Sequence, residues 1–383
     1  MATSADYFIS LLLLIGSGLF LAGITPYSPI YFFLLLAIIV FAFKQILKPE
    51  IKHNKLAYFN LFVFIFSFAA QSLIPNTKFP NTLGLILPYF FFFFCYQNLN
   101  SLSKNSFKNL IYYMLIFHTL LFIADAFWRL SHPTLYSTNM YSGHTREQGL
   151  AYMFKFNSIM YLDANFVGVQ ICLTYFFMVY LSKKNIIIPN AKIIKSLLFI
   201  LTILSTSRSA IITLLLYSVI FNRISFPITI NKKQIFGIIS LAIILIFISL
   251  ILLSILSRDA SFNSKFILID LAITLLKSAS LNTILLGIGM GNTASFIGMG
   301  AHNLIITLLI ETGLIGLLLF SINMYFLGKN TSWRSFYVVL PLITMGFSAA
   351  SLAFPFFLVQ LCIIYILEQQ NEVVLQTHTD TLL

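Results

Sequence analysis

The chain has 383 residues, of which 59% are hydrophobic and only 9% are charged. A soluble domain carries about 25% charged residues, and no soluble fold of this length could bury so much apolar surface. The formal net charge of +12 could suggest a nucleic-acid partner, but the lysines and arginines are scattered over many loops and form no basic domain. Long unbroken apolar runs also exclude a transmembrane β-barrel, whose strands alternate over about ten residues. Composition therefore predicts an all-α, polytopic transmembrane protein, a single integral membrane domain over residues 1–383 that binds no nucleic acid.

The apolar runs predict about twelve transmembrane helices of about 17–25 residues each, or slightly fewer. The expected spans are 8–24, 29–46, 57–75, 81–97, 109–129, 163–181, 193–207, 209–222, 235–256, 303–327, 335–350 and 353–368. The two short spans that flank "STSRSA" could instead be one long kinked helix. Cys95, Cys172 and Cys362 lie inside apolar runs, which favours buried thiols over a disulfide framework or a zinc site.

Most of the basic residues fall in alternate short loops, at 44–55, 104–108, 183–195, 223–233 and 329–334. The positive-inside rule assigns such loops to the cytoplasm, which places both termini there and favours an even number of spans. The basic residues on the outer side concentrate in two long segments, 130–162 and 257–302, and at Arg208. Because long loops in a compact architecture usually carry function, the outer face is the expected working surface.

The outer loop 130–162 mixes aromatic side chains with Arg146 and Glu147. Aromatic faces beside hydrogen-bonding groups suit sugar rings, although an interfacial aromatic belt has the same composition. Asp163 and Asn165 follow at the start of the next helix. Asp163 suits an N-cap there, and the alternative is that it orients a basic residue or an acceptor hydroxyl.

Arg208, in "STSRSA", lies between two apolar runs with no acidic residue nearby in the sequence. An arginine near a membrane costs several kcal/mol unless it reaches water or an anion. Its planar guanidinium pairs naturally with phosphate. Two interpretations follow, an anionic ligand at Arg208 or a side chain that extends to the membrane interface.

The second outer segment opens with Arg258 and continues through Lys265 into a helical pattern. One face of this helix would carry Asn263, Asp270, Thr274 and Lys277, and the other is apolar, which predicts an amphipathic helix in the outer interface. The glycine-rich stretch "LLGIGMGN" comes next. Because it follows no strand, a dinucleotide-binding loop is excluded, and we expect a re-entrant loop that lines a water-filled cavity.

The stretch "GAHNLIITLLIETGLIG" places His302 and Asn303 at the outer mouth of an apolar helix that also contains Glu311. An imidazole there can act as a base or hydrogen-bond a ligand near neutral pH. Glu311 more plausibly binds a neighbouring helix, with Gly313 and Gly316 allowing close packing.

The stretches "LLGIGMGN…GAHNLIITLLIETGLIGLLLF" and "STSRSA", with a basic residue where the outer segment begins, resemble the O-antigen ligase/polymerase superfamily. The resemblance covers roughly residues 130–330. It implies a GT-C-like glycosyltransferase of the bacterial inner membrane that needs no metal or other cofactor and acts at the periplasmic face. "MYLDANFVG" and the modest size look more like the Wzy-type O-antigen polymerase than the lipid A-core ligase.

Carried over onto this sequence, the resemblance implies that His302 and Arg208 are the catalytic residues. The family often has an arginine where the outer amphipathic helix begins, and this chain offers Lys265 there, with Arg258 seven residues earlier. Which of the two meets the diphosphate is left open. Further substrate contacts are expected from Arg146, Glu147, Asp163, Asn165 and Asn303.

The expected reaction transfers a glycan from undecaprenyl diphosphate to a sugar hydroxyl of another lipid-linked repeat unit, with inversion at the anomeric carbon. The implied partners are this lipid-linked oligosaccharide, membrane lipid and a chain-length regulator protein. The nearest alternative is an O-antigen ligase that uses lipid A-core as the acceptor. A lipid-linked oligosaccharide flippase or secondary transporter is more remote, because the sequence shows no repeated halves and its polar residues collect at one face.

Overall fold

The computed structural model describes residues 4–25, 28–47, 49, 51–75, 77–133, 153–154, 156–223, 226, 260–298, 303–348 and 355–380. The helices are α1 (Ser4–Gly16), α2 (Pro29–Leu47), α3 (Lys55–Ser72), α4 (Phe79–Leu99), α5 (Lys104–Ser131), α7 (Ala164–Lys183), α8 (Ala191–Leu204), α9 (Arg208–Arg223), α11 (Ala260–Ser278), α12 (Leu281–Leu286), α13 (Thr293–Ile297), α14 (Leu304–Asn330), α15 (Phe336–Gly346) and α16 (Pro355–Asp380). Two short antiparallel strands, β1 (Phe156–Ser158) and β2 (Leu162–Asp163), precede α7.

The all-α membrane class predicted from composition is confirmed. Five of the described helices, α2, α3, α5, α7 and α14, are long and apolar enough to cross a membrane. Helices also occupy the other predicted spans except 235–256, which lies outside the described residues. The "STSRSA" stretch separates two helices, α8 and α9. The number of about twelve spans and the GT-C-like arrangement stay predictions.

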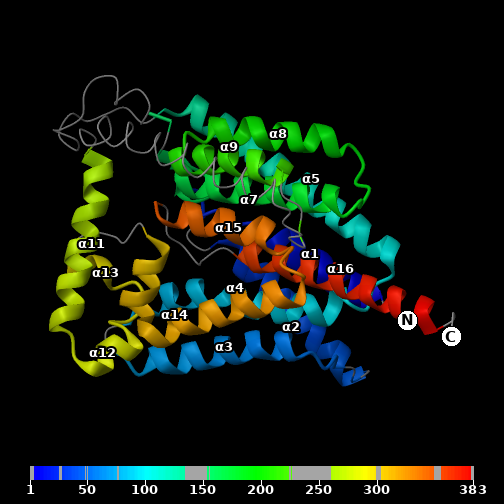
Figure 1. The fold of residues 1–383 in the computed structure, drawn as a ribbon, viewed down its shortest axis with the longest axis horizontal. Coiled ribbons are helices and arrows are strands. Elements are labelled where there is room, and N and C mark those ends of the chain that lie inside the picture. The colour runs from blue at the N-terminus through cyan, green and yellow to red at the C-terminus, as the bar shows by residue number, and fades with distance from the viewer. Residues whose placement is uncertain are drawn as a thin grey trace, which may run out of the picture.

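The long helices lie alongside one another (Figure 1). α7 packs against α8, α9 and α15, and α4 packs against α3 and α16. Both chain termini lie at one end of this bundle, and α11, α12 and α13 lie at the other (Figure 1). There α11 runs across the ends of α3 and α14. Its predicted location in the membrane interface stays a prediction.

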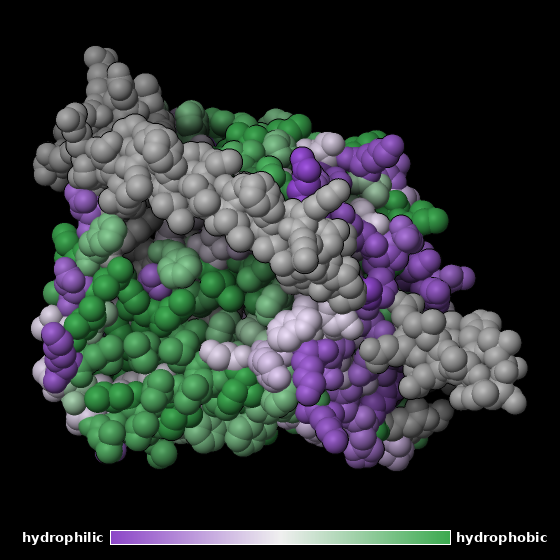
Figure 2. Space-filling model, viewed as in Figure 1, coloured by the Kyte–Doolittle hydropathy of each residue, from purple (hydrophilic) through white to green (hydrophobic). Residues whose placement is uncertain are grey.

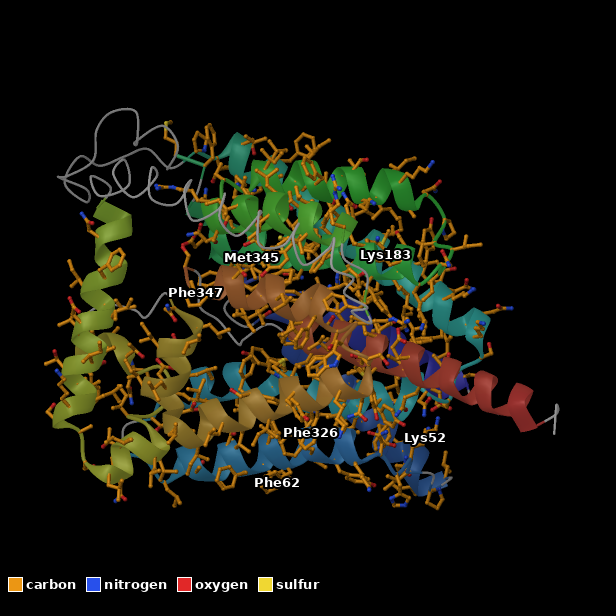
Figure 3. All side chains as sticks on the ribbon, viewed as in Figure 1. Lys52, Phe62, Lys183, Phe326, Met345 and Phe347 are labelled. Atoms are coloured by element: carbon orange, nitrogen blue, oxygen red, sulfur yellow. The ribbon has the colours of Figure 1, made fainter. Side chains whose placement is uncertain are left out.

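The end of the bundle near the termini is held together by ion pairs between segments predicted to be inner loops. The Glu368 carboxylate accepts hydrogen bonds from Lys184 Nζ (2.7 Å) and the Tyr180 hydroxyl (2.8 Å) and pairs with Arg334. Lys52 and Lys183, labelled in Figure 3, lie at the same end. The alternation of basic loops thus predicts which loops come together. The assignment of this end to the cytoplasm stays a prediction.

Apolar side chains cover the sides of the bundle. In Figure 2 a broad hydrophobic surface lies beside a hydrophilic region at the end that holds the termini. Phe32, Phe62 and Ile212 are 64%, 52% and 60% exposed, respectively. Exposed apolar area of this extent is stable only where lipid is the solvent.

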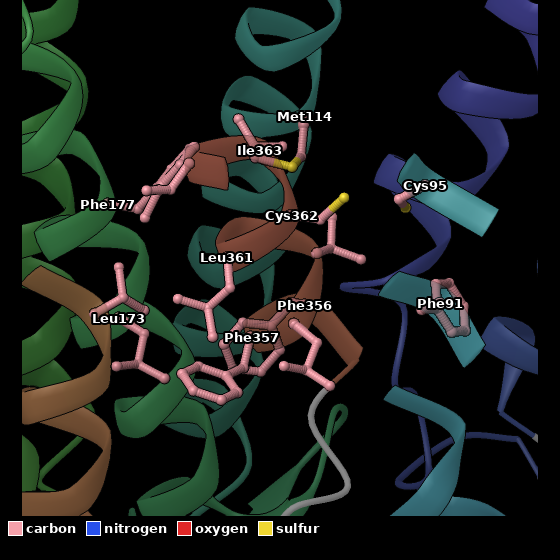
Figure 4. Close-up of a cluster of buried hydrophobic side chains, with 14 of the residues drawn as sticks. Phe91, Cys95, Met114, Leu173, Phe177, Phe356, Phe357, Leu361, Cys362 and Ile363 are labelled. Atoms are coloured by element: carbon pink, nitrogen blue, oxygen red, sulfur yellow. The ribbon is translucent and has the colours of Figure 1, made fainter. Parts of the chain in front are cut away.

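Helix α16 runs through the centre of the core. Figure 4 shows its Phe356, Phe357 and Leu361 among side chains of α4, α5 and α7. The three cysteines are free and buried, as predicted. A tightly packed centre of this kind gives the bundle a fixed frame on which its two ends are built.

The first predicted span, 8–24, is wrong at its C-terminal end, because α1 already ends at Gly16. The Ser17 hydroxyl donates to Leu14 O (2.8 Å) and satisfies a carbonyl of the last helical turn. Beyond it, the Ala22 and Gly23 amides donate to Met160 O (2.8 Å) and Ile159 O (3.0 Å). The chain therefore leaves the helix to bond the β1–β2 turn, a long-range contact that the local pattern does not encode.

Candidate functional site

Several predicted site residues begin helices at the end of the bundle opposite the termini. Arg208 is the first residue of α9, Asp163 is the N-cap of α7, and Asn303 is the N-cap of α14. The opposite ends of α7 and α14 carry Lys183 and Lys329, the inner-loop residues. The structure thus gathers the described candidates at one end, as the loop alternation predicts.

The turn before Arg208 is buried and internally hydrogen-bonded. Ser205 and Ser207 are both 0% exposed. The Ser205 hydroxyl donates to Thr202 O (2.6 Å) and accepts from the Ser207 amide (3.3 Å). Gly168 of α7 makes the close approach possible, since a Cβ there would lie 2.6 Å from Ser205 Oγ.

Arg208 itself is exposed, although the turn that carries it is not. It stands at the N-terminus of a 16-residue helix, where backbone N–H groups and the helix dipole favour anions. An arginine on a hydrogen-bonded turn suits an anionic ligand better than an arginine on a flexible loop, because less backbone freedom is lost on binding.

A buried ion pair that the sequence analysis missed lies beside this turn. Arg129 and Asp125 of α5 are 1% and 0% exposed, and Arg129 Nε donates to Asp125 Oδ2 at 2.8 Å. The Arg129 Nη1 atom also donates to two backbone carbonyls, Leu204 O (3.2 Å) and Phe154 O (3.0 Å). Leu204 is the last residue of α8, directly before the buried turn. Arg129 therefore ties α5 to the turn that presents Arg208.

The Asp125 carboxylate extends the same network to the β1–β2 hairpin. Its Oδ1 atom accepts from the Ser158 hydroxyl (2.6 Å) and the Ile159 amide (3.1 Å). Ser158 Oγ accepts in turn from the amides of Met160 (3.1 Å) and Tyr161 (3.3 Å). The four-residue spacing of Asp125 and Arg129 was a usable signal for a helical ion pair, but its backbone partners were not readable.

Tyr161 closes the hairpin against α7. Its hydroxyl donates to Gln170 Oε1 at 2.7 Å, and its ring stacks on Phe20 with centroids 4.9 Å apart. Burial raises the pKa of the Tyr161 hydroxyl well above its ordinary value, so this group stays a neutral donor.

Asp163 and Asn303 both serve as N-caps. Asp163 Oδ1 accepts from the Asn165 amide (2.8 Å), and Asp163 Oδ2 accepts from the Asn165 side chain (3.3 Å). Asn303 Oδ1 accepts from the amides of Ile305 (3.0 Å) and Ile306 (3.1 Å). The predicted capping role of Asp163 is confirmed. The predicted substrate contacts of Asp163, Asn165 and Asn303 stay predictions.

The glycine-rich stretch packs against a break in α14. Gly313 has φ 68° inside the helix, and Gly287 has φ 83°. A Cβ on Gly287 would lie 2.3 Å from Glu311 O, and one on Gly313 would lie 2.3 Å from Leu285 O. The two backbones touch, so only glycine fits at both positions. The close packing expected of Gly313 is confirmed. The predicted span 303–327 corresponds to α14, which is long and apolar enough to cross a membrane but is broken at Gly313.

Gln71 of α3 satisfies the backbone groups at this junction. Its Nε2 atom donates to Leu286 O (3.2 Å) and Glu311 O (3.4 Å), and its Oε1 atom accepts from the Met290 amide (2.9 Å). The Ile288 amide completes the junction by donating to Ile310 O at 2.9 Å. Gln71 carried no sequence signal, because one polar residue at the end of an apolar helix is ordinary.

Glu311 binds a neighbouring element, as predicted, through its carboxylate. Its Oε1 atom accepts from the Thr293 hydroxyl (2.5 Å) and the Thr293 amide (3.4 Å) at the start of α13. The partner is a short helix that precedes α14 in the chain. The segment between α13 and α14 carries the predicted catalytic histidine.

The remaining candidates fall where the structure gives no side-chain geometry. His302, Arg146, Glu147 and Arg258 lie outside the described residues. Lys265 belongs to α11, but its side chain is not described. Over the described ranges, no group of three or more His, Cys, Asp or Glu side chains could hold a metal ion.

The arrangement combines an exposed arginine at a helix start with a buried ionic network that fixes its turn. It can hold an anion. In comparisons with known proteins, the chain matches no family model, no curated protein and no solved structure.

Proposed function

We propose that this protein is an O-antigen polymerase of the bacterial inner membrane. It would transfer a glycan from undecaprenyl diphosphate to a sugar hydroxyl of a second lipid-linked repeat unit at the periplasmic face. The observation that carries the proposal is Arg208, an exposed guanidinium at the start of α9 on a turn held by the buried Arg129–Asp125 pair. A lipid diphosphate is an anion that reaches a protein at the membrane surface, where the loop alternation predicts Arg208 to lie.

In the proposed reaction, the acceptor hydroxyl oxygen attacks the anomeric carbon of the donor glycan. The bond from that carbon to the diphosphate oxygen breaks, and its electron pair stays on the diphosphate. Arg208, with Arg258 or Lys265, stabilises the developing negative charge, which is typically worth a few kcal/mol per contact in a dry site. His302 accepts the hydroxyl proton, an effect of about 10²–10⁴-fold on rate. Attack on the face opposite the leaving group inverts the anomeric centre.

The acceptor would lie on the other side of the anomeric carbon. Arg146 or Glu147 would hold its sugar hydroxyls. Asp163 and Asn303 would contribute the polar atoms that their caps leave available, such as the Asn303 amide nitrogen.

A gene-deletion strain tests the proposal. Loss of the gene should leave a single repeat unit on each lipid A-core, and the intact gene should restore long chains. Arg208→Ala and His302→Ala should not restore them, although both proteins insert in the membrane. Arg223→Ala is the matched control, because Arg223 is an exposed arginine at the far end of the same helix. Normal long chains from Arg208→Ala would overturn the role of Arg208, and lipid A-core without any repeat unit would indicate a ligase instead.

The break in α14 favours a lipid-linked oligosaccharide transporter as the second candidate, because secondary transporters use discontinuous helices. Purified protein in detergent separates the two functions, since no translocation is needed there. Polymerisation of purified lipid-linked repeat units by the wild type, lost in Arg208→Ala, supports the polymerase. No polymer from folded wild-type protein favours the transporter.

A further inference from the structure

A buried carboxylate lines a small cavity between α3, α4 and α14. Glu311 is 6% exposed, and it faces the cavity together with Ser67 of α3 and Tyr89 of α4. Met290 of the glycine-rich stretch closes one side, and most of the remaining wall is apolar. The cavity adjoins the break in α14, about 12 Å along the helix from its N-cap Asn303.

The charge of Glu311 has no partner within the part of the chain that the structure describes. Thr293 provides two hydrogen bonds to Oε1, and Oε2 accepts none from the described residues. The ion pairs of the described residues involve Asp6, Asp125 and Glu368 as the acids. An ionised carboxylate at this depth costs several kcal/mol without a counter-charge. A positive ligand would remove that cost.

Two further residues that carry hydroxyl groups line the same cavity. They are Ser67 and Tyr89, and neither hydroxyl forms a hydrogen bond with another described residue. Thr307 and Thr312 also line the cavity, but their hydroxyls donate to Asn303 O (2.7 Å) and Leu308 O (2.6 Å) of their own helix. Among the described residues, those that line the cavity with Glu311 therefore carry hydroxyl groups or apolar side chains, and none of them is a cation.

The size of the cavity restricts the ligand. The volume that the centre of a water-sized sphere can occupy is about 20 Å³. This volume holds one water molecule or an ion of similar size and excludes a sugar. A divalent cation would keep a net positive charge beside a single carboxylate, and Ca²⁺ usually takes six to eight oxygen ligands. A proton would neutralise the carboxylate but would leave both hydroxyls and the cavity without a ligand.

We propose that Glu311, with the hydroxyls of Ser67 and Tyr89, binds one Na⁺ ion. The ion would balance the buried charge and join α3, α4 and α14 where α14 is broken. Because Glu311 also holds Thr293, the bound ion would stabilise the short helix α13 that leads to the His302 segment. The proposal is independent of the proposed polymerase, and its test requires no substrate.

Thermal unfolding of the purified protein tests the site. All three cysteines are buried and free, so a thiol-reactive fluorophore reports unfolding directly. At constant ionic strength, Na⁺ in place of choline should raise Tm, by about 2 °C for each tenfold increase above half-saturation. K⁺, which is larger, should raise Tm less.

The variants separate the site from general effects of salt. Glu311→Gln should abolish the Na⁺ shift and raise Tm in choline, because it removes the unpaired charge. Tyr89→Phe and Ser67→Ala should each weaken the shift. Tyr325→Phe and Ser321→Ala are the matched controls and should retain it, because both residues are exposed on α14 away from the cavity.

Equal Tm values in Na⁺ and choline for the wild type, or an unchanged Na⁺ shift in Glu311→Gln, would overturn the proposal. A Tm that depends on pH in choline but not on Na⁺ would also overturn it and would assign a proton to Glu311. If Glu311→Gln does not fold, Tyr89→Phe decides the outcome, because it removes one oxygen without changing charge. Loss of polymerisation with an intact Na⁺ shift would affect only the proposed function.

Discussion

Replacement of Arg129 by methionine is the most informative perturbation of this structure. Methionine keeps an unbranched apolar stem but removes the guanidinium, which bonds Asp125 Oδ2 and the carbonyls of Phe154 and Leu204. The Asp125 carboxylate would keep its two hydrogen bonds from the β1–β2 hairpin but would lose its only counter-charge among the described residues. The change therefore tests how much the buried ion pair stabilises the end of the bundle that carries Arg208.

The expected magnitude follows from burial. Asp125 is 0% exposed, and removal of one partner of such a buried pair typically costs 3–5 kcal/mol. Each backbone carbonyl that loses its donor can add about 1 kcal/mol or more, although these terms do not add fully. We expect Arg129→Met to lower the free energy of unfolding by about 4 kcal/mol.

A double-mutant cycle distinguishes the ion pair from simple loss of packing. Asp125→Asn removes the carboxylate charge, so the double variant should be less destabilised than the sum of the single variants by about 2 kcal/mol. Unfolding in mixed detergent micelles by increasing SDS measures the free energies. Lys277→Met serves as the control, because Lys277 is exposed and its loss should change stability by less than about 0.5 kcal/mol. Single variants that each cost under about 1 kcal/mol, with additive effects, would refute the reasoning.

The other predictions concern the glycine junction and the bundle. Gly313→Ala should destabilise the protein by more than about 2 kcal/mol, because the added Cβ would lie 2.3 Å from backbone atoms. Gly298→Ala is the control and should cost about 1 kcal/mol from its φ of +79° alone, since nothing lies within 4 Å of its added Cβ. Equal losses of Tm in the two variants would contradict the backbone contact at Gly313. Gln71→Ala should lower the free energy of unfolding by about 1–3 kcal/mol and speed amide hydrogen exchange in residues 286–290, because three hydrogen bonds disappear. Unchanged exchange protection of these amides would show that Gln71 does not hold the junction. Asn60→Leu should lower the free energy of unfolding by about 1 kcal/mol, because it breaks the reciprocal hydrogen bonds with Asn323 (2.9 and 3.2 Å). In SDS unfolding, the Asn60→Leu, Asn323→Leu double variant should be little less stable than Asn60→Leu alone. Fully additive effects would argue against the pair.

Several features could be predicted from the sequence because their causes are local or compositional. Apolar content dictates a lipid-solvated helical bundle, and the alternation of basic loops predicts which loops meet at one end. The positions at which helices begin also have local causes, because the side chains of Asp163 and Asn303 accept hydrogen bonds from amides only two or three residues further along the chain. The glycine-rich stretch indicates close backbone approach for the same reason, because only glycine tolerates that geometry.

The tertiary structure alone decides which distant groups become partners. The Arg129 guanidinium meets the carbonyl of Leu204, 75 residues away, and Gln71 meets the backbone of Glu311, 240 residues away. It also decides where helices stop, since α1 ends at Gly16 and α14 breaks at Gly313 to serve contacts with other segments. Every residue has a backbone carbonyl, so the sequence does not mark which carbonyl accepts a side-chain hydrogen bond. A single polar residue in an apolar run indicates that its side chain needs a partner, but it does not indicate which residue that partner is. Packing of the whole bundle brings those partners within hydrogen-bond distance, and the desolvated surroundings make each of the pairings obligatory.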